Sequence, residues 1–143
     1  MNKSPKTLEF KFERTIPAPL AEVFDAWLNP ETPGTPWHEN DKLIFNPDVD
    51  GLWYWLIRGT AHYGRFTEIE RPSRIQHTWM SKYTLGHESV VTVSFEKKGE
   101  ETLMTLLHSG LPDDDAAKSH KDGWTYFLDK LVDHFGTKAR RRP

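Results

Sequence analysis

The feature that most constrains the fold is an amphipathic segment near the end of the chain, residues 113–136. Its large apolar residues are spaced three, one, three, one and three positions apart: Trp124, Phe127, Leu128, Leu131, Val132 and Phe135. This spacing places them on one stripe of an α-helix. Strand-like runs precede the segment, so we expect the helix to bury its stripe against the concave face of an antiparallel sheet. A helix across a curved sheet leaves room for a cavity, and we expect the functional site there.

The rest of the chain predicts one more helix and a series of strands. Alternating apolar and polar residues predict a half-buried strand at 7–16, and apolar residues at helical spacing predict a helix at 19–28, which Asn29-Pro30 ends. A loop rich in proline and glycine follows at 31–40. Short turns then separate six further runs, so neighbouring strands should pair antiparallel. These predicted strands are 42–46, 52–58, 61–69, 74–80, 88–97 and 101–108.

Composition limits the classes of protein that remain. The 143 residues suit a single domain, 1–143, with loose ends at 1–6 and 137–143. A net charge of −2 does not favour a nucleic-acid binder. The chain has no cysteine, which excludes disulfides, thiolate metal sites and cysteine nucleophiles. It has no apolar run of about 20 residues and no signal peptide, so we expect a cytoplasmic protein without membrane insertion.

Four segments, in this order, resemble one known family. They are IPAPLAEVFDAWLNPE (16–31), GRFTEIERPSRIQHTW (64–79), TLMTLLHSGLP (102–112) and HKDGWTYFLDKL (120–131). They are similar to the SRPBCC/START-like superfamily, in the AHSA-type branch named for the activator of heat-shock-protein-90 ATPase. The resemblance implies an α+β helix-grip fold, in which a curved antiparallel sheet of about six to seven strands wraps around a long C-terminal helix, with one or two short helices after the first strand. It also implies that an apolar small molecule is held between sheet and helix.

The aromatic residues are the candidate walls of that cavity. Six Trp, eight Phe and four Tyr are present, and apolar walls with a few polar groups are typical of small-molecule sites. Trp53 and Trp55 share one strand face, and we expect that face to point inward toward Trp124. Rings this numerous could instead fill the cavity. The predicted ligand-binding residues are Phe24, Trp37, His38, Trp53, Trp55, Tyr63, His77, Trp79, His108, Trp124 and Phe127, with an opening near Trp37 and His38.

Polar chemistry is less clearly indicated. The seven histidines show no metal-ligand spacing, and no serine-nucleophile or phosphate-loop motif is present, so we predict no metal, no cofactor and no assigned catalytic residue. The acidic run 113–115 is best interpreted as a helix cap, and the basic run 138–142 as a solvated end. If the cavity were catalytic, the acid–base candidates would be His38, Glu39, His77, Tyr83 and His108.

The leading hypothesis is a non-enzymatic carrier or sensor for an apolar small molecule, either lipid-like or aromatic and polyketide-like. One alternative is a cyclase, dehydratase or hydrolase that uses the same cavity. Another is a chaperone-associated interaction module, as the family name implies. The protein would act as a monomer or homodimer.

Overall fold

The computed structural model describes residues 7–140, which form one seven-stranded antiparallel sheet and a long helix, α3. The strands are β1 (Thr7–Ile16), β2 (Lys42–Phe45), β3 (Leu52–Ile57), β4 (Thr60–Glu70), β5 (Arg74–Trp79), β6 (Ser89–Lys98) and β7 (Glu101–Pro112). The helices are α1 (Leu20–Trp27), α2 (Asp115–Lys118) and α3 (His120–Arg140), with short 3-10 turns η1 (Pro36–His38) and η2 (Lys82–Thr84). The α+β helix-grip prediction is confirmed.

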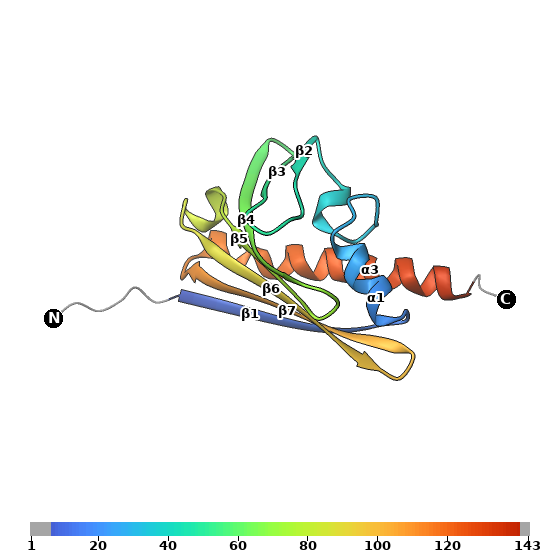
Figure 1. Ribbon diagram of the computed structural model, residues 1–143. Coiled ribbons are helices and arrows are strands. Elements are labelled where there is room, and N and C mark those ends of the chain that lie inside the picture. The colour runs from blue at the N-terminus through green and yellow to red at the C-terminus, as the bar shows by residue number, and fades with distance from the viewer. Residues whose placement is uncertain (1–6, 141–143) are drawn as a thin grey trace.

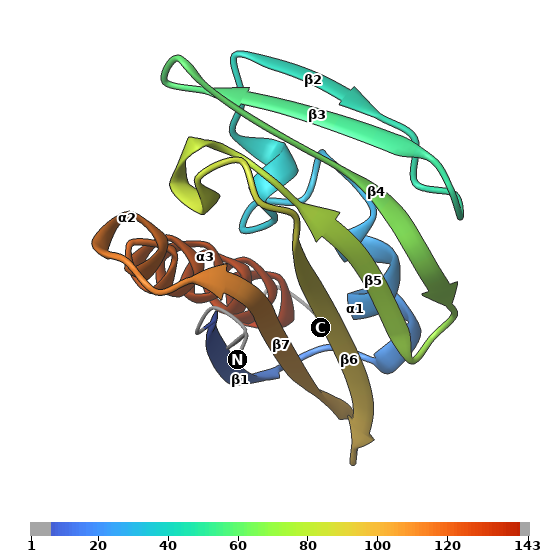
Figure 2. The ribbon, with the colours of Figure 1, turned by 90° about the vertical axis from the view of Figure 1, so that its left-hand side faces the viewer.

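The strand order is β1-β7-β6-β5-β4-β3-β2, so the first two strands of the chain lie at opposite edges. Figure 1 shows α3 running behind the sheet, and Figure 2 shows the sheet curling around that helix. The segment that joins β1 to β2 carries α1, which packs against β6 and β7. This arrangement puts the apolar stripe of α3 on the concave face, as its spacing predicted.

The stripe of α3 is buried as the sequence indicated. Trp124, Leu128, Leu131 and Phe135 are buried, and Phe127 and Val132 pack against them at the border of the core. Gly34 lies so close to the helix that an added Cβ would overlap the backbone of Leu131. The loop 31–40 therefore closes over α3 by direct backbone contact.

The ends of several elements differ from the prediction. The helix at 113–136 is two helices, because α2 ends before His120; Asp114 caps α2 by accepting a hydrogen bond from the Ala117 amide at 2.8 Å. α3 continues through 137–140, which we had expected to be a loose end, whereas 1–6 and 141–143 lie outside the described residues. β7 runs to Pro112 because a bulge at Gly110, whose φ is +75°, keeps it paired with β1.

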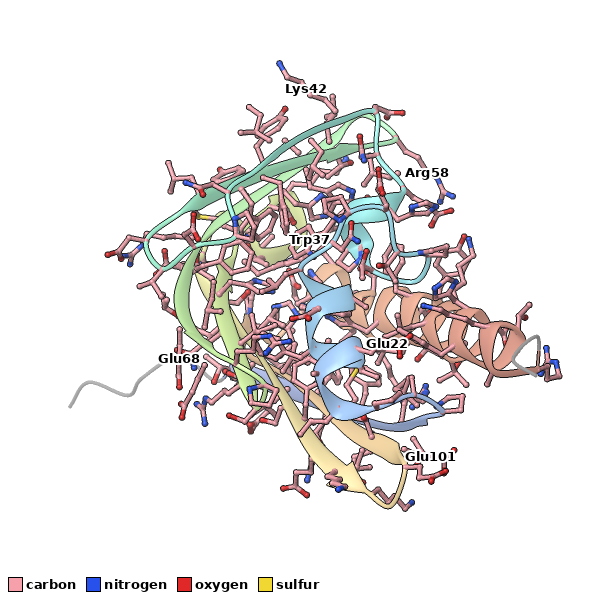
Figure 3. The ribbon with its side chains drawn as sticks, turned by 45° about the vertical axis from the view of Figure 1, so that its right-hand side comes forward. Glu22, Trp37, Lys42, Arg58, Glu68 and Glu101 are labelled. Carbon is pink, nitrogen blue, oxygen red and sulfur yellow. The ribbon has the colours of Figure 1, made fainter. Side chains whose placement is uncertain are left out.

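Large rings fill the space between α1, the sheet and the middle of α3. Trp27, Trp37, Trp53, Phe24 and Phe66 are among the largest fully buried side chains. Figure 3 shows Trp37 beneath β2 and β3, whereas Lys42 points outward from the same hairpin. On β3, Trp53 and Trp55 are buried and Leu52 is 64% exposed, which confirms the predicted inward face. The deep part of the expected cavity is therefore packed.

The β3–β4 hairpin diverges from the rest of the sheet near its tip. β4 pairs with β5 over residues 66–70, with a register shift between Phe66 and Glu68, and beyond that an isolated bridge joins Tyr63 to Met80. An added Cβ at Gly64 would overlap the Thr78 carbonyl, so the two chains touch there. Past this point the hairpin tip leaves β5, and a space opens between the tip and the beginning of α3.

Candidate functional site

A pocket of about 480 Å³ lies between the tip of the β3–β4 hairpin, η2 and the first half of α3, and it opens to solvent. Its inner walls are apolar rings, and its polar groups lie at the inner end and along the rim. The lining residues are Glu39, Trp55, Ile57, Arg58, Thr60, His62, Trp79, Tyr83, Ser119, His120, Asp122, Gly123, Trp124, Tyr126 and Phe127. Figure 3 marks the place through Arg58, at the turn between β3 and β4.

Four aromatic residues build the walls. The ring of Trp79 lies 5.7 Å from Trp55 and 5.1 Å from Trp124, measured between centroids, and Phe127 meets Trp55 edge-on at 5.9 Å. The sheet supplies Trp55 and Trp79 from inward positions of β3 and β5, and α3 supplies the other two from its stripe. The indole N–H of Trp55 donates to the Glu39 carbonyl at 2.7 Å, which fixes that ring.

Trp124 is held by a buried relay behind the pocket. Its indole N–H donates to Nδ1 of His108 at 2.9 Å, so the proton of the neutral imidazole is on Nε2. That Nε2 lies 2.8 Å from Oγ of Ser89, which in turn donates to the Trp79 carbonyl at 2.6 Å. Burial and the nearby His120 and His77 rings keep the pKa of His108 well below its ordinary value. The relay is therefore neutral, and it joins α3 to β5, β6 and β7.

Two histidines stand at the inner end of the pocket. His62 is 6% exposed and His120 is 8% exposed. Burial, with a smaller effect of the nearby His120, lowers the pKa of His62 to about 4. Burial also lowers the pKa of His120, although the Ala117 carbonyl and Asp114 oppose this effect. Both imidazoles are neutral near pH 7, so the inner end carries hydrogen-bonding groups but no charge.

Glu39, from the loop 31–40, lies on the rim of the pocket. Its carboxylate accepts hydrogen bonds at 3.1 Å from the Tyr126 hydroxyl and from Nζ of Lys130, both on α3. Burial alone would raise the pKa of Glu39, but these two hydrogen bonds and the positive charges of Lys130 and Arg58 together outweigh it, so the pKa is lowered. The hydrogen bonds that the Lys130 ammonium donates to the Tyr126 oxygen and to Glu39 raise the pKa of Lys130. Glu39 thus holds Trp55 through its carbonyl and α3 through its side chain.

The structure separates the eleven predicted ligand-binding residues into three groups. Trp55, Trp79, Trp124 and Phe127 line the pocket. Phe24, Trp37, Trp53, His77 and His108 are buried behind it, in the packed core or the relay. His38 and Tyr63 are exposed, and Nδ1 of His38 lies 3.1 Å from the Pro30 carbonyl. Neither Trp37 nor His38 lines the pocket, although the next residue, Glu39, does; Trp37 is fully buried and donates its N–H to the Trp27 carbonyl.

Sequence reasoning missed several pocket residues, above all the two inner histidines. His120 lies four residues before Trp124, on the same helical stripe, so the stripe could have been extended back to include it. His62 lies opposite the inward Trp55 in the β3–β4 pairing, and that register would have placed it inside. Glu39 and Tyr83, which we had weighed only as acid–base candidates, lie on the pocket wall.

The pocket can hold a flat apolar molecule, and its inner histidines can form hydrogen bonds with a polar group at the buried end of that molecule. Within residues 7–140, no three His, Cys, Asp or Glu side chains gather in an arrangement that could hold a metal ion. None of the helices described for 7–140 combines the length and apolar character that a membrane span requires.

Known proteins share this architecture. Protein MLL2253 from Mesorhizobium loti aligns with a TM-score of 0.78 at 22% identity, over 95% of this chain and 100% of that one. An Hsp90 activator from Plasmodium falciparum aligns with a TM-score of 0.75 at 24% identity, over 90% and 96%. DynU16, from the dynemicin biosynthetic locus, aligns with a TM-score of 0.74 at 20% identity, over 91% and 48%. At these identities the likeness shows the fold.

No curated protein matches the chain. The family model described as activator of Hsp90 ATPase homolog 1-like protein matches residues 17–136, most of the 143-residue chain. The chain therefore belongs to the family of activator of Hsp90 ATPase homolog 1-like proteins.

Proposed function

We propose that this protein is a non-enzymatic carrier or sensor that binds an apolar small molecule, aromatic and polyketide-like or lipid-like, between the β3–β4 hairpin and α3. The observation that carries the proposal is the pocket of about 480 Å³ walled by four aromatic rings. Its volume is within the range of small-molecule sites, roughly 300–1,000 Å³. The family and the fold support a binding-domain role.

The walls favour a flat ligand. Trp55, Trp79 and Trp124 form one contiguous group of rings, in which Trp79 contacts the other two, so a planar molecule would contact several rings of this wall. Each 100 Å² of apolar surface removed from water contributes about 2.5 kcal/mol to binding. DynU16 has the same fold and comes from a biosynthetic locus, a setting in which a small-molecule binder is expected.

A pair of glycine variants tests the proposal. Gly123 lines the pocket on α3, and a side chain added there meets no atom within 4 Å, so Gly123→Phe should fill the pocket without disturbing the helix. Gly136→Phe, on the same helix outside the pocket, is the matched control. Flat aromatic compounds and fatty acids are titrated calorimetrically, and the bound compound is recovered and analysed.

We expect at least one class to bind the unaltered protein and Gly136→Phe, and to bind Gly123→Phe at least about tenfold more weakly. Recovery of unchanged ligand supports a carrier, whereas conversion would favour the alternative cyclase, dehydratase or hydrolase. Equal binding to both variants, or no binding by either class, would refute the pocket as the site.

A chaperone-directed role is the second candidate. Family membership and the outer face of the β2–β4 strands favour it, since Ile44, Leu52 and Tyr63 are 54%, 64% and 42% exposed there. Substituting Leu52 by Lys should abolish capture of heat-shock protein 90 if this face binds it, while leaving the pocket intact. Equal capture by the variant, or no capture by the unaltered protein, would remove this candidate.

A further inference from the structure

The inner end of the pocket contains polar nitrogens that the protein itself does not satisfy. Trp79, His62 and His120 all line the pocket, and they are 3%, 6% and 8% exposed. Nε1 of Trp79, Nδ1 of His62 and Nε2 of His120 are buried, and none has a hydrogen-bond partner within residues 7–140. Leaving such a group unpaired is costly. Nε1 of Trp27, Nε1 of Trp53 and Nε2 of His77 are unpaired in the same way in the packed core, and the three in the pocket differ because their residues line a space that a ligand can enter.

The hydrogen-bonding role of two of these nitrogens is fixed. Nδ1 of His120 lies 2.8 Å from the Ala117 carbonyl, which can only accept, so Nδ1 carries the proton. Nε2 of the neutral His120 ring is therefore an acceptor. Nε1 of Trp79 can only donate. The centroids of the two rings are 6.5 Å apart and their planes lie at 75° to each other.

From this pair we infer that the ligand of the proposed pocket is a neutral molecule whose leading edge is a hydroxyl group on a flat aromatic body. A hydroxyl donates its proton to Nε2 of His120 and accepts the N–H of Trp79 through the same oxygen. This inference rests on the proposed function and specifies the chemical class of the ligand. The flat body then lies against Trp55 and Trp124, with the rim at Glu39.

Other groups satisfy the pair less well. A carboxylate has no proton to donate to His120, and it would lose its hydration beside two neutral imidazoles. A methyl ether accepts from Trp79 but leaves His120 unpaired. An unsubstituted hydrocarbon leaves both unpaired. The charged side chains that line the pocket, Glu39, Arg58 and Asp122, are of both signs and do not select an anion.

The test uses four matched probes: 2-naphthol, 2-methoxynaphthalene, naphthalene and 2-naphthoate. Each is titrated calorimetrically into the unaltered protein at pH 7.5. We expect 2-naphthol to bind roughly tenfold more tightly than 2-methoxynaphthalene, since one additional buried group is satisfied. We expect 2-naphthoate to bind more weakly than either.

Variants test whether the preference for 2-naphthol over 2-methoxynaphthalene comes from Trp79 and His120. His120→Phe removes the acceptor and Trp79→Phe removes the donor. His134→Phe, the same exchange on α3 outside the pocket, is the matched control. In His120→Phe the ratio of the two affinities should fall toward one, and in His134→Phe it should stay unchanged. Circular dichroism checks that each variant is folded, and the four probes on the unaltered protein decide the question if His120→Phe and Trp79→Phe do not fold.

The outcomes separate this inference from the proposed function. If the probes bind with equal affinity and Gly123→Phe weakens all of them, the pocket stands and the hydroxyl preference is wrong. If 2-naphthoate binds most tightly, the preference is also wrong, and Arg58 becomes the anchor to test. If no probe binds, or Gly123→Phe has no effect, the proposed function itself fails for this ligand class.

Discussion

The indole N–H of Trp124 donates to Nδ1 of His108 over 2.9 Å, so one buried imidazole joins the pocket wall on α3 to the sheet. His108 passes the connection to Ser89, and Ser89 passes it to the backbone of Trp79, the residue at the centre of the aromatic wall. The position of the wall therefore depends on a hydrogen-bonded relay as well as on ring packing.

The relay predicts that a small change at Ser89 is disproportionately costly. Ser89→Ala deletes one oxygen and leaves the Trp79 carbonyl and Nε2 of His108 buried without that partner, so unfolding should become easier by about 2 to 3 kcal/mol. Ser94→Ala, on the outward face of the same strand, should change stability by less than about 0.5 kcal/mol. Guanidinium unfolding of both variants measures the difference, and equal stabilities would contradict the relay.

Acid should weaken the fold before the carboxylates titrate. Burial lowers the pKa of His62 and of His77 from 6.5 to about 4. Between these values the unfolded chain binds protons that the folded chain does not, so stability is complete above pH 6.5 and falls as the pH drops toward 4. Each ring contributes on the order of 3 kcal/mol to that loss.

Unfolding measured at pH 7.5, 6.0, 5.0 and 4.5 checks this dependence. His77→Phe keeps a ring in the aromatic core and removes one titrating group, so its stability should fall less steeply with decreasing pH. A constant stability across the window, or the same slope in the variant, would show that the buried imidazoles are not the cause.

Gly34 should not tolerate a side chain. Its φ is +98°, and an added Cβ would overlap the backbone of Leu131, so Gly34→Ala must displace the loop from α3. We expect a loss of more than about 2 kcal/mol. Gly59→Ala, with φ of +79° and no atom within 4 Å, carries the backbone strain without the overlap and should cost about 1 kcal/mol. Thermal unfolding compares the two, and similar losses would mean that the contact with α3 is unimportant.

Neighbouring residues on β3 should behave in opposite ways. Trp53→Ala empties part of the aromatic core and should cost about 3 to 5 kcal/mol. Leu52→Ala removes a side chain that is 64% exposed and should change stability by about 0.5 kcal/mol or less. Urea unfolding of the two variants tests the inward face of the strand. A larger loss of stability in Leu52→Ala than in Trp53→Ala would mean that the opposite face of the strand points inward.

The buried face of each strand and helix could be predicted, because side chains on one face recur every two residues in a strand and every three to four in a helix. The two-residue repeat of β3 set Trp53 and Trp55 apart from Leu52, and the helical repeat identified Trp124, Leu128 and Leu131 as one stripe. The ends of β7 and α3 were predicted less well. We expected the last strand to end at His108, but pairing with β1 carries β7 to Pro112 through a bulge at Gly110.

The pocket itself could be predicted only in part. The sequence indicated that aromatic rings lie between sheet and helix, yet Trp37, Trp53 and His77 belong to the packed interior, and Trp55 and Trp79 belong to the pocket. These residues are alike in type and burial. They differ in how far they lie from the point where the β3–β4 hairpin leaves β5, and no local sequence pattern shows where that point is.

By itself, the sequence determined the order of the elements, the buried stripe of α3 and the inward faces of the strands, because each depends on residues a few positions apart. Only the tertiary structure decided where free space remains. That depends on how Gly64 and the register shift near Phe66 turn the hairpin tip away from β5, and on how Gly34 and Glu39 hold the loop against α3. Contacts between residues distant in the sequence set these positions, and so they alone bring His62, Trp79 and His120 to one wall.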